Sequence, residues 1–112
     1  MKIQHLGSVL PVPDIGLAVS AWSALLGVAP RFVDEDRWAQ FEVGGFRLAL
    51  AGTDRDSDSA GVMVKVDDLE EARERAQNLG LEVSQTRQGP HEARFTATAP
   101  GGWPILFYAP RT

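Results

Sequence analysis

The sequence contains no cysteine among its 112 residues. This absence excludes disulfide bonds, thiolate nucleophiles, cysteine-ligated zinc and iron–sulfur clusters. The sequence also has no apolar run near the roughly 20 residues that a membrane-spanning helix requires. The first residues, Met1–His5, lack the hydrophobic region of a secretion signal. We therefore expect a cytoplasmic protein without membrane contacts.

Positive charge is scarce as well. The 11 Lys and Arg residues are outnumbered by 15 Asp and Glu residues, which gives a formal net charge of −4. Binding to the phosphate backbone of a nucleic acid needs a concentration of basic side chains, so nucleic acid is not an expected partner. With 44% hydrophobic residues, a chain of this length can bury one core, and we expect a single domain over residues 1–112.

The two halves of the chain repeat one pattern. The segment Val12–Ile15 is similar to Val66–Leu69, and each segment begins a stretch that reads as the end of a strand, a capped helix and a glycine stop. The repeat predicts two equivalent units at about residues 1–52 and 60–112. A polar linker at about residues 53–59 joins them.

The first half is expected to begin with a strand over residues 3–10 that ends at Pro11. Asp14 is in position to cap a helix over residues 15–26, and Gly27 suits a left-handed helix end. The apolar stripe expected to be buried is Ile15, Val19, Trp22, Leu25 and Leu26. Three strands follow at about 30–35, 37–43 and 46–51, the last two joined by Gly44-Gly45.

The second half repeats this order. A strand is expected over residues 61–66, and Asp67 with Glu70 resembles a capping box for a helix that runs through Leu79. The apolar stripe expected to be buried is Leu69, Ala72, Ala76 and Leu79. Three strands follow at about 81–87, 91–98 and 103–109. Both halves thus read βαβββ, which predicts an α+β fold with two mixed sheets and one helix per unit.

Three short motifs stand where strands and helices end: Leu10–Asp14, Ala21–Gly27 and Ala99–Leu106. In this order and at these distances they resemble the vicinal oxygen chelate superfamily, which comprises glyoxalases, bleomycin-resistance proteins and extradiol dioxygenases. The resemblance implies that the sheets of two βαβββ units curve around one cavity. It also implies a homodimer, because proteins of this kind commonly dimerise and open sheet edges are usually covered.

In the metal enzymes of that superfamily, a metal ligand lies on the first and fourth strand of each unit. The corresponding residues here are Gly7, Ala49, Gly61 and Leu106, and none of them has a metal-binding side chain. The resemblance therefore implies a cavity without a metal or other cofactor.

The chain has two histidines, His5 and His91. His5 lies two residues before Gly7 and is either a displaced metal ligand or a half-exposed strand residue. His91 is either a general acid–base group or a residue at the edge of a loop.

Ligand contacts are expected on the faces of the predicted strands that do not serve the core. Trp38, Gln40 and Glu42 alternate with the core residues Ala39 and Phe41, and would supply an aromatic surface with polar groups. Glu42 makes this surface acidic, which favours a neutral or cationic ligand. Four further candidates have the strand parity of the lost metal positions: Arg47, Met63, Lys65 and Tyr108.

The function that follows is metal-independent binding of a small organic molecule in the cavity between the units. By resemblance to bleomycin-resistance proteins, the molecule would be an antibiotic that is sequestered, which gives antibiotic resistance without chemistry. The alternative is an enzyme of the same superfamily, a metal-free lyase or isomerase. A third class of function is association with a partner protein. An interior filled by side chains, with no ligand cavity, would indicate this function.

Overall fold

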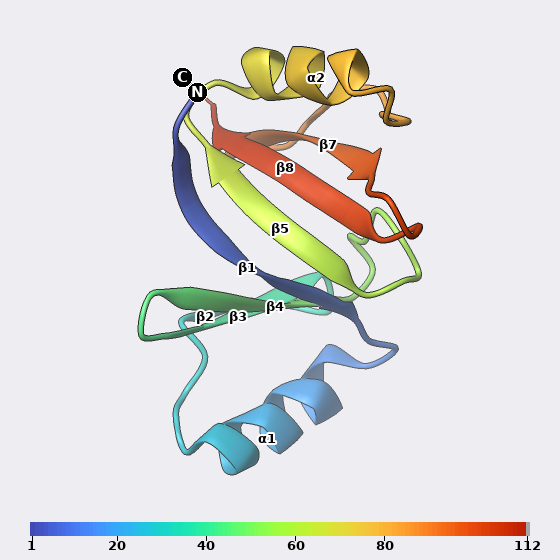
Figure 1. The fold of residues 1–112 in the computed structure, drawn as a ribbon. Coiled ribbons are helices and arrows are strands. Elements are labelled where there is room, and N and C mark those ends of the chain that lie inside the picture. The colour runs from blue at the N-terminus through green and yellow to red at the C-terminus, as the bar shows by residue number, and fades with distance from the viewer. Residues whose placement is uncertain (112) are drawn as a thin grey trace. The chain divides into compact units, whose positions relative to one another are not determined.

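The computed structural model describes residues 1–111, which form eight strands and two helices (Figure 1). In chain order these elements are β1 (Ile3–Pro11), α1 (Ile15–Leu26), β2 (Phe32–Asp34), β3 (Trp38–Val43), β4 (Phe46–Ala51), β5 (Gly61–Val66), α2 (Leu69–Asn78), β6 (Arg87–Gln88), β7 (Glu92–Thr98) and β8 (Pro104–Pro110). The order is βαβββ twice, so the predicted α+β fold is confirmed.

The chain divides into two compact units. The first unit is Gly7–Ala60, and the second unit is Met1–Leu6 together with the chain from Gly61 onward. Strand β1 therefore starts in the second unit and ends in the first.

The sheets of the two units have the same connectivity. In the first unit the strand order is β2-β3-β4-β1, with β1 parallel to β4 and the other pairs antiparallel. In the second unit the order β6-β7-β8-β5 repeats this arrangement, with β5 parallel to β8. Each unit thus joins its parallel pair by a helix and a long return, as a crossover between parallel strands requires.

Helix α1 begins and ends where the sequence predicts. The carboxylate of Asp14 accepts a hydrogen bond of 3.0 Å from the backbone N–H of Leu17, and Gly27 closes the helix with φ of 70°. The helix packs on β3 and β4. Four buried side chains form the centre of this core: Ile15, Ala39, Phe41 and Leu50.

Helix α2 begins one residue later than predicted. Its N-cap is Asp68, whose carboxylate accepts a 3.0 Å hydrogen bond from the N–H of Glu71. Asp67 instead accepts a 2.6 Å bond from the N–H of Lys2, and this bond lowers the pKa of the Asp67 carboxyl below its ordinary value. The prediction that Asp67 caps the helix was wrong because that carboxylate accepts the backbone N–H of Lys2, which lies just before β1.

The core of the second unit lies between α2 and the strands β7 and β8 (Figure 1). The rings of Phe95 and Phe107 stack at its centre with centroids 5.0 Å apart. Phe107 is partly buried, and the buried members besides Phe95 are Val64, Val66, Ala72, Ala76, Ala97 and Ala109.

Both predicted apolar stripes extend too far. Leu25 and Leu26 of α1 are 76% and 42% exposed, and Leu79 after α2 is 72% exposed. All three lie in or beyond the last helical turn, outside the core clusters of their units. Helical periodicity identifies the face of a helix but not how far along it the sheet extends.

The predicted strand over 81–87 is mostly absent. Val83 forms one isolated bridge with Ala97, and regular pairing is confined to Arg87–Gln88. The hydroxyl of Ser84 accepts the N–H of Thr96 at 2.9 Å, where a regular ladder would offer a carbonyl. Side-chain acceptors of this kind compete with strand pairing.

Among residues 1–111, neither helix has the length and the apolar character needed to cross a bilayer.

Replacing Asp68 with alanine should lower the free energy of unfolding by about 1 kcal/mol, because the N–H of Glu71 loses its acceptor. Urea denaturation of the wild type and Asp68→Ala measures the difference. Glu74→Ala is the matched control, because Glu74 is exposed on the same helix and the change removes the same charge. We expect the control to stay within about 0.5 kcal/mol of wild type. An equal loss in both variants would show that the cap itself contributes nothing.

Candidate functional site

Each unit has one sheet face that its helix does not cover. We call these the helix-free faces. In the first unit, Leu48 and Leu50 of β4 point toward α1, so Arg47 and Ala49 point to the helix-free face. The register pairs Arg47 with Glu42 and Ala49 with Gln40, and Trp38 shares their parity.

The predicted contact residues of the first unit therefore lie together. The indole N–H of Trp38 donates a 3.2 Å hydrogen bond to the Oε1 of Gln40. Gln40 is 8% exposed, whereas Trp38 is half-buried. This bond fixes the edge of an aromatic ring beside a polar group, which suits recognition of an organic molecule.

The charge of Glu42 is balanced within the same unit. Its carboxylate lies 3.0 Å from an η-nitrogen of Arg31 and 3.5 Å from the Nε of Arg47. The sequence suggested an acidic surface here because Glu42 was considered alone. With two guanidinium groups beside it, this carboxylate no longer favours a cationic ligand.

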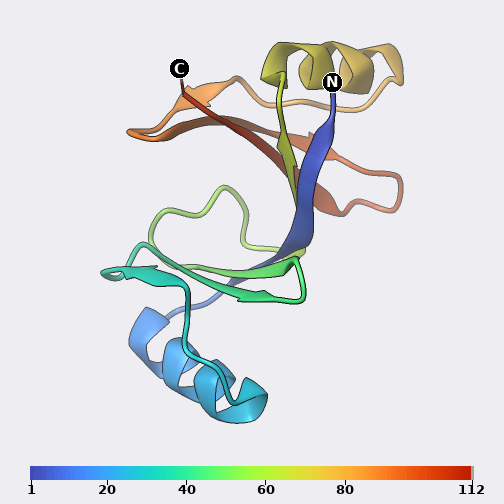
Figure 2. The ribbon, with the colours of Figure 1, turned by 90° about the vertical axis from the view of Figure 1, so that its left-hand side faces the viewer.

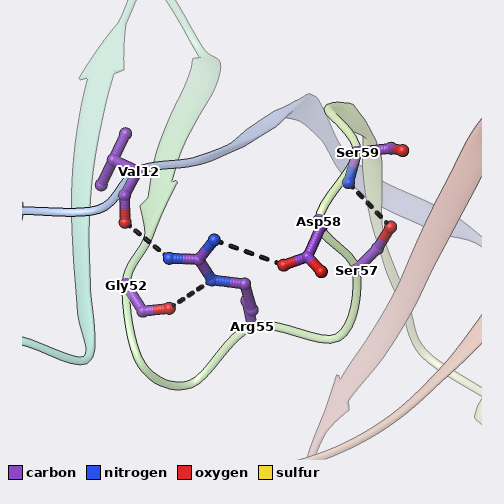
Figure 3. A network of polar contacts seen from close by, with 6 residues as sticks. All are labelled: Val12, Gly52, Arg55, Ser57, Asp58 and Ser59. Carbon is purple, nitrogen blue, oxygen red and sulfur yellow. Dashed lines mark hydrogen bonds and ion pairs between the residues drawn. The ribbon is translucent and has the colours of Figure 1, made fainter.

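The linker after β4 is more ordered than a solvated segment. Its Arg55 donates from Nε to the carbonyl of Gly52 at 2.8 Å and from an η-nitrogen to the carbonyl of Val12 at 2.7 Å, and it lies 3.4 Å from Asp58 (Figure 3). Residues 52–60 thus form an arch on the side of the β3–β4 hairpin away from α1 (Figure 2). Arg55 could not be identified from the sequence, because its acceptors are backbone carbonyls that no motif marks.

The second unit places its candidates on one face as well. Val64 and Phe107 belong to the core under α2, so Met63, Lys65 and Tyr108 point to the helix-free face. Lys65 is directly beside Tyr108, and Met63 is beside Leu106. Met63 is 2% exposed, while Lys65 and Tyr108 are half-buried.

Arg94 also lies on this face, although the sequence did not identify it as a candidate. It lies opposite Tyr108 on β7 and is only 9% exposed. Its position depends on the register between β7 and β8, which the alternation of residues within β7 does not define.

The two histidines differ in their surroundings. His5 is a half-buried residue of β1 that has interactions within the protein, whereas His91 is exposed in the turn before β7. The carbonyl of His91 accepts the N–H of Arg111 at 3.1 Å. His91 thus lies at the edge of a loop.

The glycines at the two first-strand metal positions are sites of close backbone contact. A Cβ at Gly7 would overlap the carbonyl oxygen of Arg47, and a Cβ at Gly61 would overlap that of Pro104. The neighbouring strand fills the space beside each glycine. A metal-binding side chain at either position would require the strands to move apart.

The two fourth-strand metal positions are occupied by buried apolar residues. Ala49 is fully buried and Leu106 is 6% exposed. Within residues 1–111, no group of three or more His, Asp or Glu side chains is arranged to hold a metal ion.

No protein-family model matches the sequence, and no curated protein matches it significantly. Solved structures do match it. A protein from Legionella pneumophila described as an NAD-dependent benzaldehyde dehydrogenase is similar with a TM-score of 0.83 and 14% identity, over 95% of this chain and 99% of the other.

Two further structures match nearly the whole chain. A glyoxalase/bleomycin resistance protein/dioxygenase superfamily member from Vibrio splendidus 12B01 has a TM-score of 0.70 and 15% identity, over 98% of this chain and 100% of the other. Methylmalonyl-CoA epimerase from Streptomyces coelicolor, in complex with 2-nitronate-propionyl-CoA, has a TM-score of 0.69 and 16% identity, over 100% of this chain and 99% of the other.

At these identities the similarity establishes the fold alone. The chain has the vicinal oxygen chelate fold, as found in the glyoxalase/bleomycin resistance/dioxygenase superfamily. The predicted resemblance is thus confirmed at the level of the fold.

Replacing Gly7 with alanine should reduce the free energy of unfolding by roughly 1–3 kcal/mol, because the added methyl group forces β1 away from β4. Gly16→Ala is the matched control. The nearest atom to a Cβ there is an Oδ of Asp14 at 3.4 Å, and alanine favours a helix over glycine. Urea denaturation should show Gly16→Ala unchanged or stabilised by up to about 1 kcal/mol. A Gly7→Ala protein as stable as wild type would contradict the close contact.

Proposed function

We propose that this protein binds a small organic molecule on its helix-free sheet faces without a metal ion. The observation that carries the proposal is the half-buried indole of Trp38, which is fixed by the amide of Gln40 on a face that α1 leaves free. An ordered aromatic ring with adjacent polar groups is a typical lining of a small-molecule site.

Three features support binding over metal chemistry. Glycine backbone contacts occupy two of the superfamily metal positions, and buried apolar side chains occupy the other two. The polar side chains on the helix-free faces are those of an orienting surface: an amide, a phenol, a carboxylate and several cations. Antibiotics are the first compounds to test, because one solved structure with this fold is named as a glyoxalase/bleomycin resistance protein/dioxygenase superfamily member.

A thermal-shift screen of antibiotics and small metabolites identifies the ligand, because a bound molecule raises the melting temperature by mass action. With that ligand, Trp38→Ala should weaken binding by roughly 1–3 kcal/mol, the value of one buried aromatic side chain. Tryptophan fluorescence titration measures the dissociation constant. The constant should be the same in the presence of a chelator, because no metal takes part.

Trp103→Ala is the matched control, since Trp103 is 62% exposed in the turn before β8 and its loss should not alter affinity. If Trp38→Ala binds the ligand as tightly as the wild type does, Trp38 does not contribute to the binding site. A ligand released by the chelator would contradict metal independence.

We also propose that the protein is a homodimer that buries the outer face of α1. The helix contains no charged residue, and its Leu17 and Leu25 are 73% and 76% exposed. A second copy is the partner that fits this surface. A two-fold contact brings the same patch from each chain together, and an uncharged patch does so without the repulsion expected elsewhere on a chain of net charge −4.

Leu25→Glu should therefore convert the dimer to a monomer, because it places two carboxylates in an apolar contact. Light scattering after gel filtration measures the mass against the 12.2 kDa of one chain. Leu79→Glu is the control, because Leu79 is 72% exposed but follows the charged helix α2. A wild-type protein of monomer mass, or dissociation by Leu79→Glu alone, would contradict the proposed interface.

A further inference from the structure

The side-chain amide of Gln40 is held in one orientation. The indole N–H of Trp38 can only donate a hydrogen bond, and it donates over 3.2 Å to the Oε1 of Gln40. The oxygen of the amide therefore faces Trp38, and the nitrogen is directed away from that contact. The backbone of Gln40 is fixed as well, because its carbonyl accepts the N–H of Arg31 at 2.7 Å.

The nitrogen of this amide is a donor without an acceptor in the protein. Among the residues that the structure describes, the Nε2 of Gln40 donates to no other group, although only 8% of the residue is exposed. This nitrogen is not completely enclosed by other atoms. A donor that is more than nine-tenths buried is costly to leave without an acceptor. The position therefore favours an acceptor from outside the chain.

Two aromatic side chains lie beside this amide. Phe32 of β2 is paired directly with Gln40, so the two side chains lie on the same face, roughly 5 Å apart at their Cβ atoms. Trp38 is two residues along β3 on that face, at roughly 7 Å. Phe32 is 46% exposed and Trp38 is half-buried. All three residues belong to the first unit and lie on its helix-free face.

The charges on this face favour a neutral acceptor over an anion. Glu42 follows Gln40 by two residues on the same face of β3. Its carboxylate lies 3.0 Å from an η-nitrogen of Arg31 and 3.5 Å from the Nε of Arg47. Both of these cations thus already hold a carboxylate, and the donor that Gln40 presents is uncharged. A carboxylate on the ligand would also be repelled by Glu42.

We infer that the amide nitrogen of Gln40 donates a hydrogen bond to a carbonyl oxygen of the ligand, so that the ligand is a planar carbonyl compound. This inference rests on the proposed function and names its ligand class. The rings of Trp38 and Phe32 supply aromatic surface for a flat molecule, and the single polar group fixes the orientation of that molecule.

The test compares three flat bicyclic molecules of similar shape. Indanone carries a carbonyl acceptor, indole carries an N–H donor, and indene carries neither. Titration of the isotopically labelled full-length protein by NMR gives a dissociation constant for each probe. Indanone should bind about three to ten times more tightly than indene, the value of one net hydrogen bond, and should shift the side-chain amide signal of Gln40. Indole should bind no more tightly than indene.

Gln40→Glu separates contact with the ligand from a structural role. A carboxylate at this position still accepts the indole N–H of Trp38 but can no longer donate. The preference for indanone over indene should therefore disappear, and indole should become the tightest of the three probes. Gln77→Glu is the matched control, because it adds the same charge at an exposed position of α2 and should leave all three constants unchanged.

A carboxylate at a buried position can also destabilise the fold, which the NMR spectrum of Gln40→Glu would show. The comparison then uses Gln40→Met, which keeps the length of the side chain without a charge or a donor. This variant should bind indanone and indene equally.

The outcomes separate this inference from the proposed function. Equal binding of indanone and indene by the wild type, or a preference for indanone that survives in Gln40→Glu or Gln40→Met, would overturn the role of Gln40 and leave small-molecule binding intact. A ligand from the screen that shifts the indole signal of Trp38 but has no carbonyl group would do the same. If neither the three probes nor any screened compound shifts that signal, the proposed function itself is contradicted.

Discussion

A side chain at Gly7 would occupy the place of the Arg47 carbonyl oxygen, and one at Gly61 would occupy that of the Pro104 carbonyl. In each unit, therefore, a parallel strand pair approaches at a point where only glycine fits. In the first unit Gly7 of β1 pairs with Arg47 of β4, and Arg47 also pairs with Glu42 of the neighbouring strand β3. The polar groups of the helix-free face take their positions from that register.

The two faces of each sheet carry different kinds of residue. One set of alternating residues packs under a helix and supplies most of the stabilising apolar contact. The other set carries the polar and aromatic groups of the helix-free faces, and these groups differ between the two units. In the first unit these groups are a tryptophan, an amide and a balanced ion pair, and in the second unit they are cations and a phenol.

Local sequence was sufficient to predict most of the fold. Asp14, Gly27 and the Gly44-Gly45 turn act within a few residues of themselves, so their effects could be read directly. The choice between Asp67 and Asp68 as helix cap could not be predicted from local sequence, because it depends on Lys2, which is distant in the sequence. The strand predicted over 81–87 failed for a similar reason, since Ser84 pairs through its hydroxyl.

The candidate site shows the same limit. Alternation correctly placed Trp38, Gln40 and Glu42 on one face, because it needs only the parity of one strand. The roles of Arg94 and Arg55 depend on contacts between strands or with distant carbonyls, and both were missed.

Strand β1 has a consequence for how this chain can be divided. Its residues Ile3–Leu6 belong to the second unit and its residues from Gly7 onward to the first. A chain cut in the linker would therefore leave the second unit without one of its own segments, although the sequence repeat suggests two interchangeable halves. Neither half of the sequence repeat is therefore a complete compact unit, and exchanging one half between homologues would exchange parts of both units.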